Sequence, residues 1–188
     1  MKNELSTQFY LQRIINILLI NGGFLENVGL YTGEMGLVLF FFRYARYTGN
    51  GLYKDYGFDL IEKIQNRLHN ETPIDYKQGT SGIGSAIEYL VQEGFIDADT
   101  DEILEEFDHR IFSMCNPPDL SIENVLSTGY YAIWRLSGNS AQKDNILTKI
   151  LPPIVAIMSD WNTKHDDLLH QTVSLNANDT KNADLHKK

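Results

Sequence analysis

The side chains that could do chemistry are few in this sequence and lie far apart along it. The one cluster of histidines and carboxylates comprises His165, Asp166, Asp167 and His170, and zinc accepts such ligands. Four residues separate the two histidines, which matches no known zinc motif, so we interpret the cluster as a solvated helix end. The sequence therefore predicts no metal site, no catalytic residue and no cofactor.

Cys115 is the sole cysteine of the chain. A single cysteine excludes an internal disulfide framework and any zinc site with two cysteine ligands from this chain. His109 lies six positions earlier, which is more than one and a half helical turns, so the two side chains face different sides of a straight helix. We interpret Cys115 as a small core residue and His109 as a solvent-facing one.

Two glutamates and two tyrosines are candidates for contact with a ligand. Glu34 stands at the expected start of a buried helix, where the helix dipole stabilises a carboxylate, so capping and ligand contact are both open. Glu88 has apolar neighbours, and a half-buried carboxylate needs a partner. Tyr130 and Tyr131 could line the same surface, although aromatic residues at helical spacing usually belong to the core.

The elements that must position these residues are helices. Apolar residues recur at helical spacing along most of the chain, Gly, Asn and Pro residues separate the periodic segments, and no convincing strand alternation is found. The pattern predicts an all-α chain of about seven helices, over residues 9–20, 33–47, 53–69, 82–93, 103–114, 122–136 and 141–160. Pro152 and Pro153 should kink or interrupt the last of these.

Three glycine-containing segments recur, each leading into an apolar helix. They are Leu30–Leu37, Tyr76–Ile83 and Leu126–Ile133, and their leading glycines are separated by 46 and then 50 residues. This period indicates helical-hairpin repeats. We interpret the glycines as sites of close helix packing. The alternative is that helix N-termini line a pocket for an acyl or anionic group. The structural glycines are Gly33, Gly36, Gly79, Gly82 and Gly129.

The segments that begin at Gly29 and Gly79 resemble motifs of the lanthionine synthetase C-like family. The first reads Gly-Leu-Tyr-Thr-Gly-Glu-Met-Gly and the second Gly-Thr-Ser-Gly-Ile-Gly; the resemblance covers about residues 28–136. It implies an α/α toroid, built in the family from about seven hairpins. In the family's cyclases a zinc ion activates a peptide cysteine thiol, which adds to a dehydrated Ser or Thr to form a thioether ring.

The family's zinc-binding strings, Trp-Cys-x-Gly and Cys-His-Gly, do not occur in this sequence. About three hairpins fit, so we expect a partial toroid over residues 1–165 and a polar, disordered tail over residues 166–188. Two functions remain: a non-catalytic module that binds a peptide or partner protein, or the N-terminal half of a zinc-dependent thioether-forming cyclase. A carbohydrate-processing toroid that uses Glu34 and Glu88 is a weaker third alternative.

The formal charge of −9 argues against binding to nucleic acid or to an anionic membrane surface. No segment is long and apolar enough to span a bilayer, and the N-terminus does not look like a secretory signal, so we expect a cytoplasmic protein. The first and last helices are more apolar than one neighbour can cover. A homodimer that buries one of these ends is therefore expected.

Overall fold

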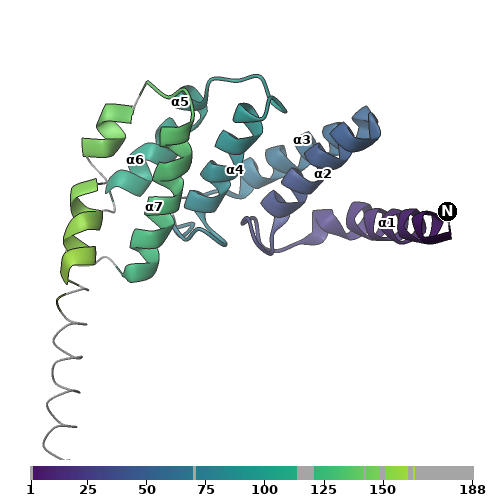
Figure 1. The fold of residues 1–188 in the computed structure, drawn as a ribbon, viewed down its shortest axis with the longest axis horizontal. Coiled ribbons are helices and arrows are strands. Elements are labelled where there is room, and N and C mark those ends of the chain that lie inside the picture. Colours follow the sequence, from purple (N-terminus) through teal and green to yellow (C-terminus); the bar gives the residue numbers. More distant parts are fainter. Residues whose placement is uncertain are drawn as a thin grey trace, which may run out of the picture.

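The structure is a computed structural model that describes residues 2–69, 71–113, 121–141, 143–148, 151–160 and 163. Figure 1 shows the helices in an elongated array, with α1 at one end, α2 and α3 next to it, then α4, and with α6, α7 and residues 151–160 at the other end. Helices and their connections account for all of the described chain, and no strand occurs in it. The all-α fold class predicted from the periodicity is confirmed.

The chain begins with α1 (Lys2–Asn21), followed by a short 3-10 helix, η1 (Gly22–Phe24). One face of α1 packs on the main core, where Ile15 is fully buried and Leu11, Leu18 and Leu19 are partly buried. The opposite face is exposed to solvent. Its exposed apolar residues form what we call the α1 stripe: Phe9, Tyr10, Ile14, Ile17 and Ile20.

The first hairpin consists of α2 (Glu34–Thr48) and α3 (Gly51–Arg67). Gly49 ends α2 in the left-handed conformation, with φ of 69°, which glycine adopts without steric cost. The side chain of Asn50 then caps α3 by accepting a hydrogen bond from the backbone of Leu52 at 3.1 Å. The two helices pack tightly through apolar side chains, since Leu60 and Ile64 of α3 are buried with Phe41 and Phe42 of α2.

The second hairpin pairs α4 (Thr80–Gln92) with two short helices, α5 (Thr100–Ile103) and α6 (Glu105–Ser113). The sequence predicted a single helix here, and the structure divides it at Leu104. Asp99 caps α5 by accepting a hydrogen bond from the backbone of Asp101 at 2.9 Å. Leu104 is fully buried, so the break lies inside the protein.

The third hairpin begins with α7 (Ile122–Ser137). Residues 143–148 and 151–160 are also helical. Pro152 and Pro153, expected to kink or interrupt the last helix, lie within the helical residues 151–160, while residues 149 and 150 lie outside the described chain. The predicted boundary at residue 165 and the predicted tail over 166–188 also lie outside it.

The first helices of the second and third hairpins run parallel. Glu88 of α4 is hydrogen-bonded to Arg135 of α7, 47 residues later. Gly84 faces the ring of Tyr131 at the same separation along the chain, and a Cβ on Gly84 would lie 2.6 Å from that ring. From the first contacting pair, Gly84 and Tyr131, to the second, Glu88 and Arg135, the position advances by four residues on each helix, which is about one turn. Because both positions advance in the same direction, α4 and α7 run parallel.

The separation of 47 residues between contacting positions of α4 and α7 corrects the predicted alignment of the third repeat segment. The repeat pattern in the sequence aligned Gly129 with Gly79, but a separation of 47 residues aligns Gly129 with Gly82. Gly33 and Gly79 are the N-cap residues of α2 and α4, whereas Gly129 lies inside α7, so it does not lead a helix. The physical reason is that Ser121 caps α7 two turns earlier, by accepting a hydrogen bond from the backbone of Asn124.

The remaining predicted glycines lie where the backbone comes close. A Cβ on Gly33 would lie 2.5 Å from the carbonyl oxygen of Asn27, and one on Gly36 would lie 2.5 Å from that of Leu30. Cβ atoms on Gly79 and Gly82 would overlap the carbonyl oxygens of residues 73 and 76. The loop that precedes each helix therefore folds back onto the helix's first turn. Among the described residues, no helix is long and apolar enough to cross a membrane.

Candidate functional site

Glu34 lies in the first turn of α2 and is fully buried. Its carboxylate is paired with Lys63 Nζ at 2.7 Å and with an Arg67 guanidinium nitrogen at 2.8 Å, both from α3. Arg67 also donates hydrogen bonds to the carbonyl oxygens of Leu25 and Glu26. The structure thus places Glu34 in a clamp that holds the first hairpin to the loop before it, with both carboxylate oxygens occupied by cations of the same chain.

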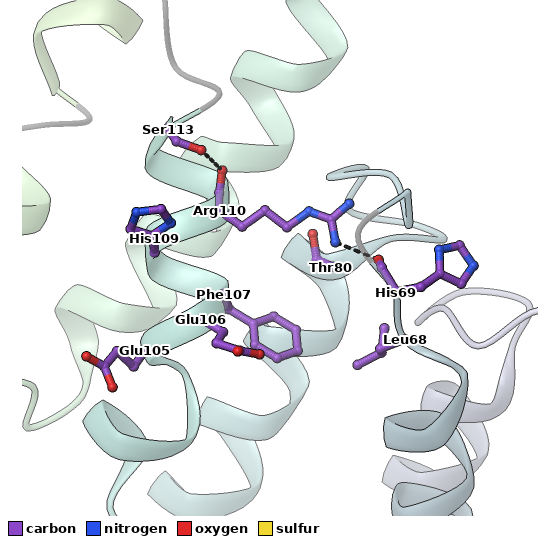
Figure 2. A pocket seen from close by; sticks show the side chains of 9 residues that line it. All are labelled: Leu68, His69, Thr80, Glu105, Glu106, Phe107, His109, Arg110 and Ser113. Atoms are coloured by element: carbon purple, nitrogen blue, oxygen red, sulfur yellow. Dashed lines mark hydrogen bonds between the residues drawn. The ribbon is translucent and has the colours of Figure 1, made fainter.

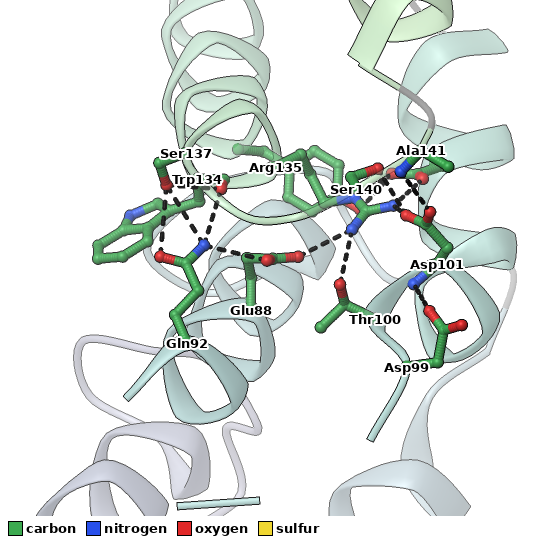
Figure 3. Close-up of polar contacts among 12 residues, drawn as sticks. Glu88, Gln92, Asp99, Thr100, Asp101, Trp134, Arg135, Ser137, Ser140 and Ala141 are labelled. Carbon is green, nitrogen blue, oxygen red and sulfur yellow. Dashed lines mark hydrogen bonds and ion pairs between the residues drawn. The ribbon is translucent and has the colours of Figure 1, made fainter. Parts of the chain in front are cut away.

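Glu88 belongs to a second, separate cluster, built around a fully buried arginine (Figure 3). The Arg135 guanidinium contacts three carboxylates: Glu88 at 2.8 Å, Asp101 at 2.7 Å and Asp108 at 2.8 Å. These residues come from α4, α5, α6 and α7, so one side chain joins four helices. With all four groups ionised, the cluster carries two net negative charges.

Further hydrogen bonds compensate this excess negative charge. The Tyr131 hydroxyl donates a hydrogen bond to Asp108 at 2.5 Å. Asp101 accepts from the Ser140 hydroxyl at 2.5 Å and from the Ala141 backbone at 2.7 Å. Gln92 donates to Glu88 at 3.0 Å. Each carboxylate therefore accepts at least one hydrogen bond besides those from Arg135.

This environment changes three pKa values. Burial alone would lower the pKa of Arg135, but hydrogen bonds to Asp108 and Glu88 outweigh it and raise that pKa. Burial alone would raise the pKa of Asp101, but hydrogen bonds from Ser140, Arg135 and the Ala141 backbone outweigh it and lower that pKa. Burial raises the pKa of Tyr131 well above 10, and the charge of Asp108 acts in the same direction. The cluster is therefore held as charged Arg135 and Asp101 with a neutral Tyr131.

Tyr131 gives the chain a pH-dependent stability at alkaline pH. Because its folded pKa is raised, its contribution is fully present below pH 10 and is lost as the pH rises from 10 through the folded pKa. We expect the free energy of unfolding to fall above pH 10, and to fall less steeply in Tyr131→Phe, by up to about 1.4 kcal/mol per pH unit. Urea melts across this pH range measure both slopes. Tyr47→Phe, at an exposed site, is the control, and equal slopes for Tyr131→Phe and the parent would contradict the prediction.

The two predicted tyrosines have opposite surroundings. Tyr131 is fully buried inside the Arg135 cluster, so its side chain is closed to an external ligand. Tyr130, the next residue on the helix, is 53% exposed and its ring lies 5.1 Å from that of Tyr76. Tyr76 in turn lies 6.3 Å from Tyr31. Tyr31, Tyr76 and Tyr130, one from each repeat segment, form a continuous set of rings that we call the tyrosine row.

The described part of the chain has both apolar and polar hollows. An apolar groove of about 530 Å³ lies between α7 and residues 151–160, and we call it the α7 groove; it is lined by Ile122, Val125, Leu126, Gly129, Tyr130, Ile133, Ile154, Ile157 and Met158. Tyr130 belongs to both the tyrosine row and the α7 groove, so these two features are continuous.

A polar hollow of about 610 Å³ lies beside the Arg135 cluster and includes Glu88, Asp101 and Asn139.

A further hollow, a cleft of about 600 Å³, lies between the end of α3 and α6 (Figure 2). Arg110 crosses it and donates hydrogen bonds to the carbonyl oxygens of His69, at 2.8 Å, and Thr72. His69 and His109 lie on opposite sides of the Arg110 side chain in Figure 2. Since Arg110 ties α6 to the turn after α3, this contact joins two neighbouring hairpins.

A family model described as Lanthionine synthetase C-like protein matches residues 25–183. The chain belongs to this family. The match extends well beyond residues 28–136, where motifs were found in the sequence, and it includes every described helix from α2 onward. The family's fold is an α/α toroid, and the parallel stacking of helical hairpins in this lanthionine synthetase C-like chain is consistent with a partial toroid. Comparisons with curated proteins and with solved structures give no significant match.

Within the described part of this lanthionine synthetase C-like chain, no group of three or more His, Cys, Asp or Glu side chains is arranged to hold a metal ion. The carboxylates that do gather surround Arg135, which already provides their positive charge. These residues do not fit the zinc ion that the family's cyclases use. Cys115, His165 and His170 lie outside the described residues.

Sequence reasoning missed the partners that explain Glu34 and Glu88. Arg135, Asp101 and Asp108 are far apart along the chain, and only the packing of α4 to α7 brings them together. Tyr31 and Tyr76 were also missed as site residues. Their signal was present, because each stands shortly before the leading glycine of a repeat segment.

Proposed function

We propose that this lanthionine synthetase C-like chain is a non-catalytic module that binds a peptide along the tyrosine row. The observation that carries the proposal is the contact of Tyr31, Tyr76 and Tyr130 across three hairpins, with ring centres 6.3 and 5.1 Å apart. Tyr31 is 64% exposed and Tyr130 is 53% exposed. Three adjacent aromatic rings at a surface form a platform of the kind that marks a binding site.

The dimensions of the row suit an extended peptide. In an extended chain, side chains on one face repeat about every 6.6–6.8 Å, which is close to the ring spacing of 5.1–6.3 Å. Tyrosine adds large contact area at low cost in side-chain entropy, and its hydroxyl serves as a hydrogen-bonding group.

The chemistry of the family favours a particular class of peptide. Family cyclases act on peptides in which a cysteine thiol adds to a dehydrated Ser or Thr. We therefore propose peptides that contain Cys together with Ser or Thr as ligands. In this proposal the chain holds the peptide, and any covalent step belongs to another protein or domain.

Fluorescently labelled synthetic peptides of this class test the proposal by anisotropy. We expect Tyr31→Ala and Tyr76→Ala each to weaken binding about tenfold, or about 1.4 kcal/mol, because each removes one aromatic contact. Tyr47→Ala is the matched control, since Tyr47 is 76% exposed at the other end of α2. Its affinity should stay within about twofold of the parent value.

Two results would contradict the proposal. One is the absence of saturable binding for every peptide of this class. The other is equal loss of affinity in the row variants and in Tyr47→Ala, which would indicate nonspecific contact with exposed rings. Urea melts of Tyr31→Ala and the parent should coincide, because Tyr31 is largely exposed.

A further inference from the structure

Two apolar surfaces of the chain have no covering element within the described residues, and they lie at opposite ends of the array of helices (Figure 1). The α1 stripe is at the N-terminal end, where Ile14, Ile17 and Ile20 are 51–69% exposed. The α7 groove is at the other end, where Leu126 and Ile133 are 55% and 63% exposed. Exposed apolar patches of this kind mark sites of association.

The α1 stripe has the form of a helix that binds in a groove. Tyr10, Ile14 and Ile17 stand at positions i, i+4 and i+7, the spacing by which an amphipathic helix inserts side chains into an apolar groove. The opposite face of α1 packs on the core through Ile15, so the α1 stripe faces the solvent on a helix whose position is fixed. The α7 groove, at about 530 Å³, has room for more than one such side chain.

Charge also complements the two surfaces. Arg13 lies within the α1 stripe and stacks over Phe9 at 6.0 Å. Glu123 lies on α7 seven residues before Tyr130, two helical turns along the same edge of the groove. A chain with a net charge of −9 repels its own copies overall. An arginine of one copy that approaches a glutamate at the rim of the other copy's groove offsets part of this repulsion. This pairing favours contact of the α1 stripe with the α7 groove rather than contact between two α7 grooves.

We propose that the α1 stripe of one copy occupies the α7 groove of a second copy. The α1 helix cannot fill the groove of its own chain, because the two lie at opposite ends of the array (Figure 1). Each copy carries one stripe and one groove, so the interface is heterologous. Two copies that close on each other make two such interfaces, and copies that do not close add head to tail. The inference does not depend on peptide binding.

Sedimentation of the full chain at tens of micromolar tests the docking. We expect the parent to associate, and Ile17→Glu and Ile133→Glu to be monomers, because each places a charge in one half of the interface. Leu52→Glu is the control. Leu52 is 71% exposed on α3, outside both surfaces, so this variant should associate like the parent.

Mixing the two monomeric variants gives the decisive result. Ile17→Glu keeps an intact α7 groove and Ile133→Glu keeps an intact α1 stripe, so an equimolar mixture should form one-to-one dimers through the single intact interface. Tyr31→Ala, which weakens the proposed peptide site, should associate like the parent. The same assay therefore separates failure of the docking from failure of the peptide site.

Three outcomes would overturn the inference. They are a monomeric parent at tens of micromolar, an Ile17→Glu variant that still dimerises, which indicates groove-to-groove contact, and a mixture that stays monomeric. Exchange of the rim charges provides an independent check. Arg13→Glu and Glu123→Arg should each weaken association, and together, in one chain, they should restore it; failure to restore it would contradict the assigned pairing.

Discussion

Replacement of Arg135 by methionine should lower the free energy of unfolding by about 3–5 kcal/mol, the usual cost of breaking a buried ion pair by removing one partner. The reason is electrostatic. Arg135 is fully buried and contacts Glu88, Asp101 and Asp108, so its loss leaves three carboxylates around a site without a cation. Methionine keeps much of the side-chain volume, which separates the loss of charge from the creation of a cavity.

Urea denaturation of Arg135→Met and Arg43→Met provides the measurement and its control. Arg43 is exposed on α2 and stacks over the ring of Tyr89 at 5.2 Å, so its loss should cost about 1 kcal/mol or less. Equal stabilities of the two variants at neutral pH would show that Arg135 does not hold the four helices together.

Gly82→Ala should destabilise the protein by about 3 kcal/mol, although alanine is the better helix former by about 1 kcal/mol. A Cβ on Gly82 would overlap the carbonyl oxygen of Tyr76 and lie 3.1 Å from Cβ of Leu30. Relief of this overlap requires the loop before α4 to move away from the helix. That loop is fixed, since the backbone of Tyr76 donates a hydrogen bond to Ser127 of α7 at 3.0 Å.

Gly129→Ala is the matched substitution with the opposite expected sign. Gly129 occupies the equivalent position in α7, but a Cβ there would meet only Ile154, at 3.8 Å, which is ordinary contact. We expect this variant to gain up to about 1 kcal/mol from helix propensity. Thermal or urea melts of the two variants compare them directly. A loss of similar size at both sites would mean that the third hairpin is packed like the second.

Much of the architecture could be predicted from the sequence, because it depends on local patterns. Apolar residues at helical spacing and glycines between them located α2, α3, α4 and α7 to within about three residues of their observed ends. The segments around Gly33 and Gly79 also indicated the repeat and the family, which the match over residues 25–183 confirms. Such patterns span only a few helical turns, and over that length the spacing of residues in the sequence fixes their relative positions on the helix.

The register between hairpins and the identity of the site were decided by tertiary structure alone. The repeat pattern in the sequence aligned Gly129 with Gly79, and the packing of Glu88 on Arg135 aligns it with Gly82 instead. Arg135 shows no sign in the sequence of being buried, since an isolated arginine is normally exposed. Its burial depends on three carboxylates from other helices. Tyr130 and Tyr131 are neighbours in sequence, but the rotation of about 100° between successive residues of a helix exposes one ring and buries the other.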